Sequence, residues 1–168
     1  MIENYEDVTG YTLDDATERE LLRAQNECTF MWANKDGWPV GVTMSYVHDA
    51  GRFWLTAARH RKRIAAIARD PRVAVCVSST GSRMARNKTV TYKGLASLYD
   101  DEATKAWFYP ALAGAVRPED REGQRQFAEF LDSPDRVVIE VIPTQRIGFD
   151  GAKMREATQV SLRERRAG

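Results

Sequence analysis

A cluster of positive side chains near the middle of the chain has the spacing of an anion-binding site. Arg59, Arg61, Lys62 and Arg63 follow a short run of strand-forming residues that ends at Thr56, and they open a segment with helical spacing. Cations at a helix N-terminus oppose the helix dipole by about 0.3–1 kcal/mol each at an exposed site, while the free N–H groups there favour an anion. The arrangement predicts a site for a phosphate-like group close to Thr56.

The same cluster has a second interpretation, which is a solvated surface. No known loop motif supports the phosphate interpretation, because the glycines of a Walker loop and of the dinucleotide fingerprint are missing. What favours it is that the charges lie at the end of the helix that the dipole penalises.

The elements that must position this cluster lie within residues 52–79, which read as strand, turn, helix and strand. Residues 53–56 are strong strand formers. Ile64 and Ile67 recur at helical spacing. Residues 73–77 are apolar at every position, which is typical of a strand buried on both faces.

The strand expected over Pro39–Val47, after an Asp-Gly turn, has two different faces. One face is apolar and is predicted to belong to the core; it carries Val40, Val42, Met44 and Tyr46. The other face is small and polar near its middle and carries Gly41, Thr43, Ser45 and Val47. This second face either leaves room for a flat ring and offers it hydroxyls, or simply faces water.

Composition excludes several classes of protein. The chain has 168 residues and a net charge of +1, so no global field draws nucleic acid or an anionic membrane. No apolar run reaches membrane-spanning length and the N-terminus does not read as a signal peptide, so we expect a cytoplasmic protein. Cys28 and Cys76 are expected to be buried reduced thiols. His48 and His60 lack zinc-ligand spacing with them, so no metal is expected.

The remaining segments predict a mainly β (α+β) fold. Helices are expected over 13–25 with Thr12 as N-cap, from 100–101 to a disturbance at Pro110, and over 123–131. Further strands are expected over 28–34, 89–99 and 136–142, with 145–150 as a candidate short strand, and 80–88 is expected to be a loop. Residues 151–168 are either a docked helix or a frayed tail. About six strands joined by tight turns predict a six-stranded antiparallel barrel with flanking helices, in a single domain over 1–168 whose first helix lies within 1–26.

Three segments carry a resemblance to a known family: PVGVTMSYVHDAGRFWLTAARHRKRIAAIARDPRVAVCV, VTYKGLASLYDDEATKAWFYPAL and DRVVIEVIPTQRIGFDGAKM. In this order they resemble the split β-barrel flavin and deazaflavin oxidoreductases, the group that includes pyridoxamine 5'-phosphate oxidase. The resemblance implies an FMN-binding type of split barrel. It also implies that the cofactor phosphate is held by a Thr and an Arg-Lys pair, which here are Thr56, Arg61 and Lys62. The family usually has Ser before that pair, where this chain has His60.

The resemblance implies the remaining cofactor-binding residues as well. The strand that lies along the isoalloxazine ring supplies backbone contacts, and it corresponds here to Val40, Gly41, Val42, Thr43, Met44 and Ser45. Leu55, His60 and Lys88 complete the expected set. The C-terminal Trp and Arg pattern that reads pyridoxal substrates is missing, so vitamin B6 oxidation is not favoured. No acid–base pair stands out, so no catalytic residue is assigned. Four aromatic residues either line the open face of the ring or belong to the core: Tyr46, Tyr92, Trp107 and Tyr109.

The cofactor implied by the resemblance is the deazaflavin F420, with FMN as the alternative. The Ala- and Arg-rich sequence is similar to the actinobacterial branch of the family, in which F420 is the usual partner. Its acidic polyglutamate tail has a candidate groove in Arg59, Arg63, Arg83, Arg86 and Lys88, unless these are ordinary surface residues. The implied activity is hydride transfer between the cofactor and a small organic substrate. A homodimer is expected, because one barrel offers only part of the pocket.

Two other classes of function stay open. Some proteins of this fold bind flavin or haem without catalysis, and His48 or His60 would be a candidate haem ligand. A nucleic-acid module over residues 59–72 is disfavoured by the near-zero net charge and by the lack of a recognition motif.

Overall fold

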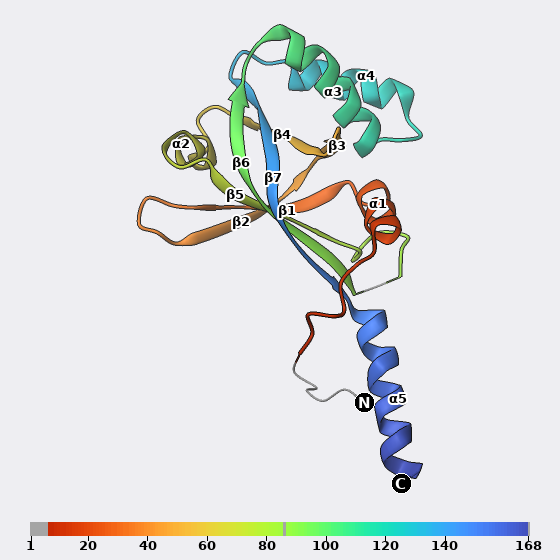
Figure 1. The fold of residues 1–168 in the computed structure, drawn as a ribbon. Helices are drawn as coiled ribbons and strands as arrows, with labels where there is room; N and C mark the ends of the chain where they lie inside the picture. The colour runs from red at the N-terminus through yellow and green to blue at the C-terminus, as the bar shows by residue number, and fades with distance from the viewer. Residues whose placement is uncertain (1–6, 86, 168) are drawn as a thin grey trace. The chain divides into compact units, whose positions relative to one another are not determined.

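The computed structural model describes residues 7–85 and 87–167, and within them the chain forms seven strands and five helices (Figure 1). The elements follow one another as α1 (Asp15–Ala24), β1 (Glu27–Ala33), β2 (Pro39–Ser45), β3 (Val47–Asp49), β4 (Arg52–Ala58), α2 (Lys62–Arg69), β5 (Arg72–Ser78), β6 (Lys88–Tyr99), α3 (Glu102–Val116), α4 (Arg121–Leu131), β7 (Arg136–Asp150) and α5 (Gly151–Ala167).

The chain divides into two compact units. Unit 1 comprises Met1–Gln25, Val77–Thr91 and Ile147–Gly168, and unit 2 comprises Asn26–Cys76 and Tyr92–Arg146. Unit 2 therefore contains β1 to β4, the three helices α2, α3 and α4, and the larger parts of β5, β6 and β7.

The strands form one sheet in the order β2-β1-β5-β6-β7-β4-β3. Four pairs of neighbouring strands are antiparallel: β1 with β2, β1 with β5, β3 with β4, and β4 with β7. This confirms a mainly antiparallel β fold with flanking helices, consistent with a split barrel. The expected number of six strands was wrong. The additional strand is β3, which pairs with β4. The turn between them, predicted over residues 48–51, consists only of Ala50 and Gly51, whose positive φ angles of 48° and 76° are typical of a tight hairpin.

Unit 2 has apolar side chains on both faces of β4 and β7. Phe53, Leu55 and Ile139 point to one side and are fully buried. On the other side, α3 and α4 lie against each other (Figure 1) and bury Phe108, Leu112 and Leu131 with Val138 of β7. Each such buried side chain contributes about 1.5–3 kcal/mol relative to leaving it in water.

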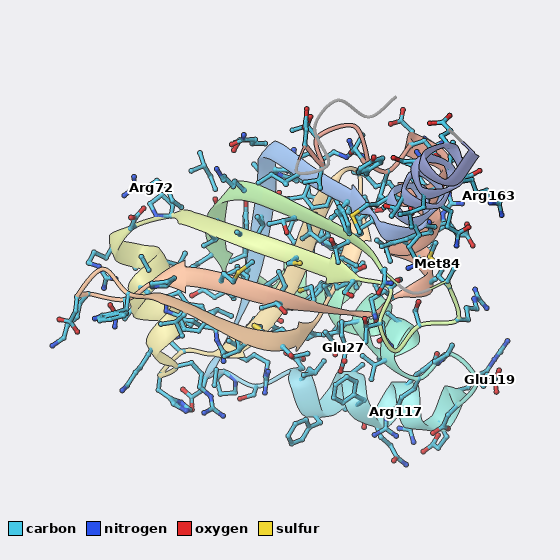
Figure 2. The ribbon with its side chains drawn as sticks, turned by 90° about the horizontal axis from the view of Figure 1, so that it is seen from below. Glu27, Arg72, Met84, Arg117, Glu119 and Arg163 are labelled. Atoms are coloured by element: carbon cyan, nitrogen blue, oxygen red, sulfur yellow. The ribbon has the colours of Figure 1, made fainter. Side chains whose placement is uncertain are left out.

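Two helix predictions required correction. The N-cap of α1 is Asp14, which accepts from the N–H of Thr17 at 2.9 Å, rather than Thr12. Helix α3 continues through Pro110 to Val116, because burial of Leu112 beyond the proline compensates for the missing hydrogen bond. The polar connection from α3 to α4 carries Arg117 and Glu119 (Figure 2).

In unit 1, hydrogen bonds connect the end of β7 to the segment before α1 and to the start of α5. The N–H of Asp150 donates to the carbonyl of Tyr11 at 2.6 Å, and Asp150 Oδ1 accepts from the N–H of Ala152 at 2.9 Å where α5 begins. The segment 151–168, for which a helix and a frayed tail were both open, is helical to Ala167. Among the residues that the structure describes, no helix is long and apolar enough to cross a membrane.

Candidate functional site

A tight turn connects β4 to α2 and places the predicted anion-binding residues. The N–H of Arg61 donates to the carbonyl of Ala58, the last residue of β4, at 3.0 Å. The N–H of Arg59 donates to the carbonyl of Asp135 at 2.6 Å. Both bonds hold the backbone between strand and helix, so the start of α2 is fixed to the end of β4.

The N-terminus of α2 differs electrostatically from those of α1, α3 and α4. Those three helices each have an Asp at the N-cap, Asp14, Asp101 and Asp120, and each carboxylate accepts from a backbone N–H of the first turn. Helix α2 instead has Arg61 at the N-cap, with no side-chain cap and no acidic residue in the first turn. Its N–H groups and its cations thus present only positive charge.

Two of the four cations have partners within unit 2. Arg59 forms an exposed ion pair with Asp100 at 3.0 Å. The guanidinium carbon of Arg63 lies 5.7 Å from the ring centre of Trp32, and burial together with the nearby Arg61 lowers the pKa of Arg63. These two residues are therefore engaged with the protein itself.

The other two cations are available to a ligand. Arg61 and Lys62 are exposed, and neither side chain has a hydrogen bond or ion pair within residues 7–85 and 87–167. His60, the residue before them, is also exposed. The structure therefore presents the predicted Arg-Lys pair with its charge free.

The strand residues before the turn contribute differently. The side chain of Leu55 is fully buried, so only its backbone can face a ligand. Thr56 is half-buried and its hydroxyl donates to the carbonyl of Val137 at 2.9 Å. With this bond intact, the Thr56 oxygen can accept a hydrogen bond but cannot donate one to a phosphate. Tyr109 is buried near Thr56, and burial raises its pKa.

The predicted ring-binding strand is β2, at the edge of the sheet with β1 as its one sheet neighbour in the described structure. Its apolar face was expected to be core, yet only Tyr46, which follows it, is buried. Three residues of that face are half-buried: Val40, Val42 and Met44. Gly41 and Thr43 are exposed and Ser45 is half-buried. Because an edge strand pairs with a neighbour on one side only, one line of backbone groups of β2 is left unpaired in the described sheet.

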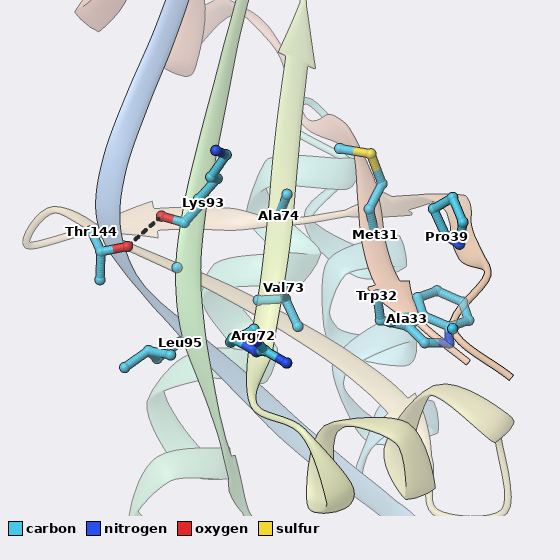
Figure 3. Close-up of a pocket in the computed structure, with 12 residues that line it drawn as sticks. Met31, Trp32, Ala33, Pro39, Arg72, Val73, Ala74, Lys93, Leu95 and Thr144 are labelled. Atoms are coloured by element: carbon cyan, nitrogen blue, oxygen red, sulfur yellow. Dashed lines mark hydrogen bonds between the residues drawn. The ribbon is translucent and has the colours of Figure 1, made fainter. Parts of the chain in front are cut away.

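A hollow of unit 2 lies elsewhere and is lined in part by residues of β1, β5 and β6 (Figure 3). It measures about 580 Å³ and is lined mainly by apolar or small residues, with Arg72 and Lys93 also among the lining residues. The lining includes Met31, Ala33, Ala74, Gly94, Leu95 and Thr144. None of the sequence-predicted cofactor residues lines it.

Lys88, the remaining predicted cofactor residue, lies in unit 1 and is engaged there. Its Nζ forms an ion pair with Asp150 at 2.7 Å, and the two side chains are 13% and 4% exposed. Arg83 of the predicted tail groove is exposed, and Arg86 lies outside the described residues.

One buried carboxylate has a larger role than the sequence indicated. Glu140 of β7 is 1% exposed; its Oε1 is paired with Arg52, and its Oε2 accepts from the hydroxyl of Tyr99 at 2.8 Å. The hydrogen bond to Glu140 raises the pKa of Tyr99. Both carboxylate oxygens have partners, so Glu140 is a structural group and not a free base. Tyr46, Tyr92 and Tyr109 are likewise buried, whereas Trp107 is 38% exposed.

Comparison with known proteins identifies the family. Residues 15–148 match the family described as Pyridoxamine 5'-phosphate oxidase. No curated protein matches the sequence significantly.

Solved structures share the fold at low sequence identity. The conserved hypothetical protein Rv2991 from Mycobacterium tuberculosis is 16% identical, with a TM-score of 0.70, over 83% of this chain and 86% of that one. An F420 reductase is 20% identical, with a TM-score of 0.54, over 77% and 94%. HutZ, the haem storage protein from Vibrio cholerae, is 13% identical, with a TM-score of 0.59, over 79% and 92%.

Proposed function

This chain belongs to the pyridoxamine 5'-phosphate oxidase family, and we propose that it is an oxidoreductase that uses the deazaflavin F420 to transfer a hydride to or from a small organic substrate. FMN is the alternative cofactor. The structural similarity to an F420 reductase supports the proposal at the level of the fold. The choice of F420 over FMN rests on the Ala- and Arg-rich composition of the chain.

The observation that carries the proposal is the start of α2. Within the described residues, it combines two cations without a partner, Arg61 and Lys62, with a helix N-terminus that has neither an acidic cap nor an acidic first turn. A phosphate there would receive hydrogen bonds from the backbone and charge from both side chains. Since Thr56 donates to Val137, we assign the anchor mainly to Arg61, Lys62 and the backbone of α2.

The accessible edge strand gives the second support. Gly41 and Thr43 of β2 are exposed, and the backbone groups on the unpaired edge of β2 can orient the polar edge of a ring. When bound, the cofactor supplies the hydride chemistry. The protein binds its phosphate, orients the ring and shields it from water.

We also propose that the working form is a homodimer in which a second copy covers the apolar hollow of unit 2. Leu95 is 48% exposed and Met31 and Ala74 are half-buried beside it. Near the hollow Ile142 is 42% exposed, and Trp38, next to the lining residues Gly37 and Pro39, is 70% exposed. Such a contiguous apolar surface is typical of an interface.

Substitution of the anchor residues tests the cofactor site. Arg61→Ala and Lys62→Ala should each weaken binding of F420, titrated by fluorescence, by about 10-fold or more, because a hydrogen bond between charged groups contributes about 1.5–3 kcal/mol before screening by solvent. The matched control is Arg69→Ala, at the other end of α2, whose side chain donates to the carbonyl of Ala33. If Lys62→Ala binds F420 as tightly as wild type, the anchor is wrongly assigned.

Non-catalytic haem binding is the second candidate, favoured by the structural similarity to a haem storage protein. His48 and His60 are both exposed, so either imidazole could reach a ligand. A Soret band after addition of haem to the purified protein, lost in His48→Ala or His60→Ala, would support this alternative.

A further inference from the structure

Three arginines converge on one hollow in unit 1. Arg19 and Arg23 come from α1, where their spacing of four residues places them on the same face of the helix. Arg83 comes from the loop between β5 and β6. All three line a hollow of about 360 Å³, and the small side chains of Ala16 and Ala24 leave its middle open.

The loop that carries Arg83 is held in place by hydrogen bonds within unit 1. The side-chain amide of Gln25, directly after α1, donates to the carbonyls of Ser78 and Thr80 at 2.9 and 3.0 Å. The hydroxyl of Ser82 donates to the carbonyl of Ser79 at 2.9 Å. Met84, labelled in Figure 2, marks this loop. The arginine of the loop is therefore positioned beside the arginines of the helix.

The positive charge of this hollow is not neutralised by the protein. None of the three guanidinium groups has a hydrogen bond or an ion pair in the described part of the chain, and Glu20 is the one acidic residue among the lining residues. Other exposed arginines do have carboxylate partners: Arg59, Arg72, Arg117 and Arg125. Since the whole chain has a net charge of only +1, this concentration of charge is local.

We propose that the hollow binds a linear anion with two or more carboxylate or phosphate groups. The guanidinium group is planar and forms paired hydrogen bonds with both kinds of anion. Three guanidiniums around an open centre match several negative groups on one ligand better than a single charge. The arginines of this hollow are different residues from the anchor residues Arg61 and Lys62, so the proposal can be tested without the cofactor.

Calorimetric titration of the full chain without cofactor tests this proposal at low salt. The probes are the peptide Glu-Glu-Glu and tripolyphosphate, with acetate as a single-charge comparison. We expect saturable binding of at least one of the two polyanions, and the one that binds identifies the source as an acidic peptide or an oligophosphate. Affinity should fall about 3- to 10-fold with each arginine removed and should weaken further as salt is added.

The variants are Arg83→Ala and the double change Arg19→Ala with Arg23→Ala, which leaves α1 intact because Ala is a strong helix former. The control is Arg163→Ala on α5, in the same unit and exposed (Figure 2). Circular dichroism verifies that each variant is folded. The proposal is overturned if neither polyanion binds saturably, or if Arg163→Ala weakens binding as much as the hollow variants do.

Discussion

Lys88 Nζ donates to Asp150 Oδ2 at 2.7 Å, and this pair joins the start of β6 to the start of α5 inside unit 1. Burial alone would raise the pKa of Asp150, but the hydrogen bonds from Lys88 and from the N–H of Ala152 hold it below its ordinary value. Because both side chains are almost fully buried, each charge would be strongly destabilising without the opposite charge beside it.

Removing one partner of this pair should destabilise the protein strongly. Lys88→Met leaves the Asp150 carboxylate buried without its cation, and we expect the free energy of unfolding to fall by about 3–5 kcal/mol in urea titrations. The control is Arg125→Ala, which removes exposed ion pairs with Glu122 and Glu129 and should change stability far less, because exposed pairs are screened by solvent. Equal effects of the two changes would contradict the role assigned to the pair.

Capping of α1 by Asp14 predicts a specific response to acid. Hydrogen bonds from the N–H and hydroxyl of Thr17 lower the pKa of Asp14 to about 2. Its folded pKa is below the unfolded value, so the stabilisation is present above about pH 4 and is lost as the pH falls towards 2. Asn caps helices without titrating. In Asp14→Asn, the urea concentration at the midpoint of unfolding should therefore fall less between pH 6 and pH 2 than it does in wild type. The same fall in both proteins would refute the assignment.

Because β6 and β7 approach each other closely at Gly94, any side chain at this position should destabilise the folded protein. A Cβ at Gly94 would lie 2.6 Å from the carbonyl oxygen of Ile142, so Gly94→Ala should cost about 1–3 kcal/mol. The matched control is Gly114→Ala in α3, where a Cβ meets nothing within 4 Å and should stabilise the helix by about 0.5–1 kcal/mol. Melting temperatures that move the same way for both variants would contradict this contrast.

If a second copy covers the apolar hollow of unit 2, a charged side chain placed in this hollow should weaken the dimer. Wild type should sediment as a dimer at micromolar concentration, and Leu95→Lys should shift it towards monomer with little change in the stability of the folded chain. Phe130→Lys on α4, where the side chain is 71% exposed, is the control and should remain dimeric. A wild-type monomer with cofactor bound would show that the interface does not form.

Local sequence rules predicted the elements around the anion site and missed what depends on distant partners. The run of cations, the apolar spacing of Ile64 and Ile67 and the strand before them are all local, and the structure has each where it was expected. The partners of Lys88 and Glu140 are not local: Asp150 lies 62 residues away and Arg52 lies 88 away. Residue type alone therefore could not reveal that Lys88 and Glu140 are paired inside the protein.

The hollow of unit 2 shows the same limit. Its lining comes from β1, β5, β6 and β7, so it exists only once the strand order is known. Similarly, the apolar alternation of Val40, Val42 and Met44 predicted a core face, but the position of β2 at the edge of the sheet leaves these residues half-buried. Alternation fixes which side chains share a face, whereas the topology decides how deeply that face is covered.

The measurement that tests the central claim most directly is the titration of F420 and of FMN into the wild-type protein, followed by fluorescence and absorption. We predict that F420 binds more tightly than FMN and that Lys62→Ala weakens F420 binding by about 10-fold or more, while Arg69→Ala leaves it unchanged. Tighter binding of FMN than of F420 would replace the proposed cofactor with FMN. Binding of neither, together with a Soret band when haem is added, would contradict the oxidoreductase proposal itself.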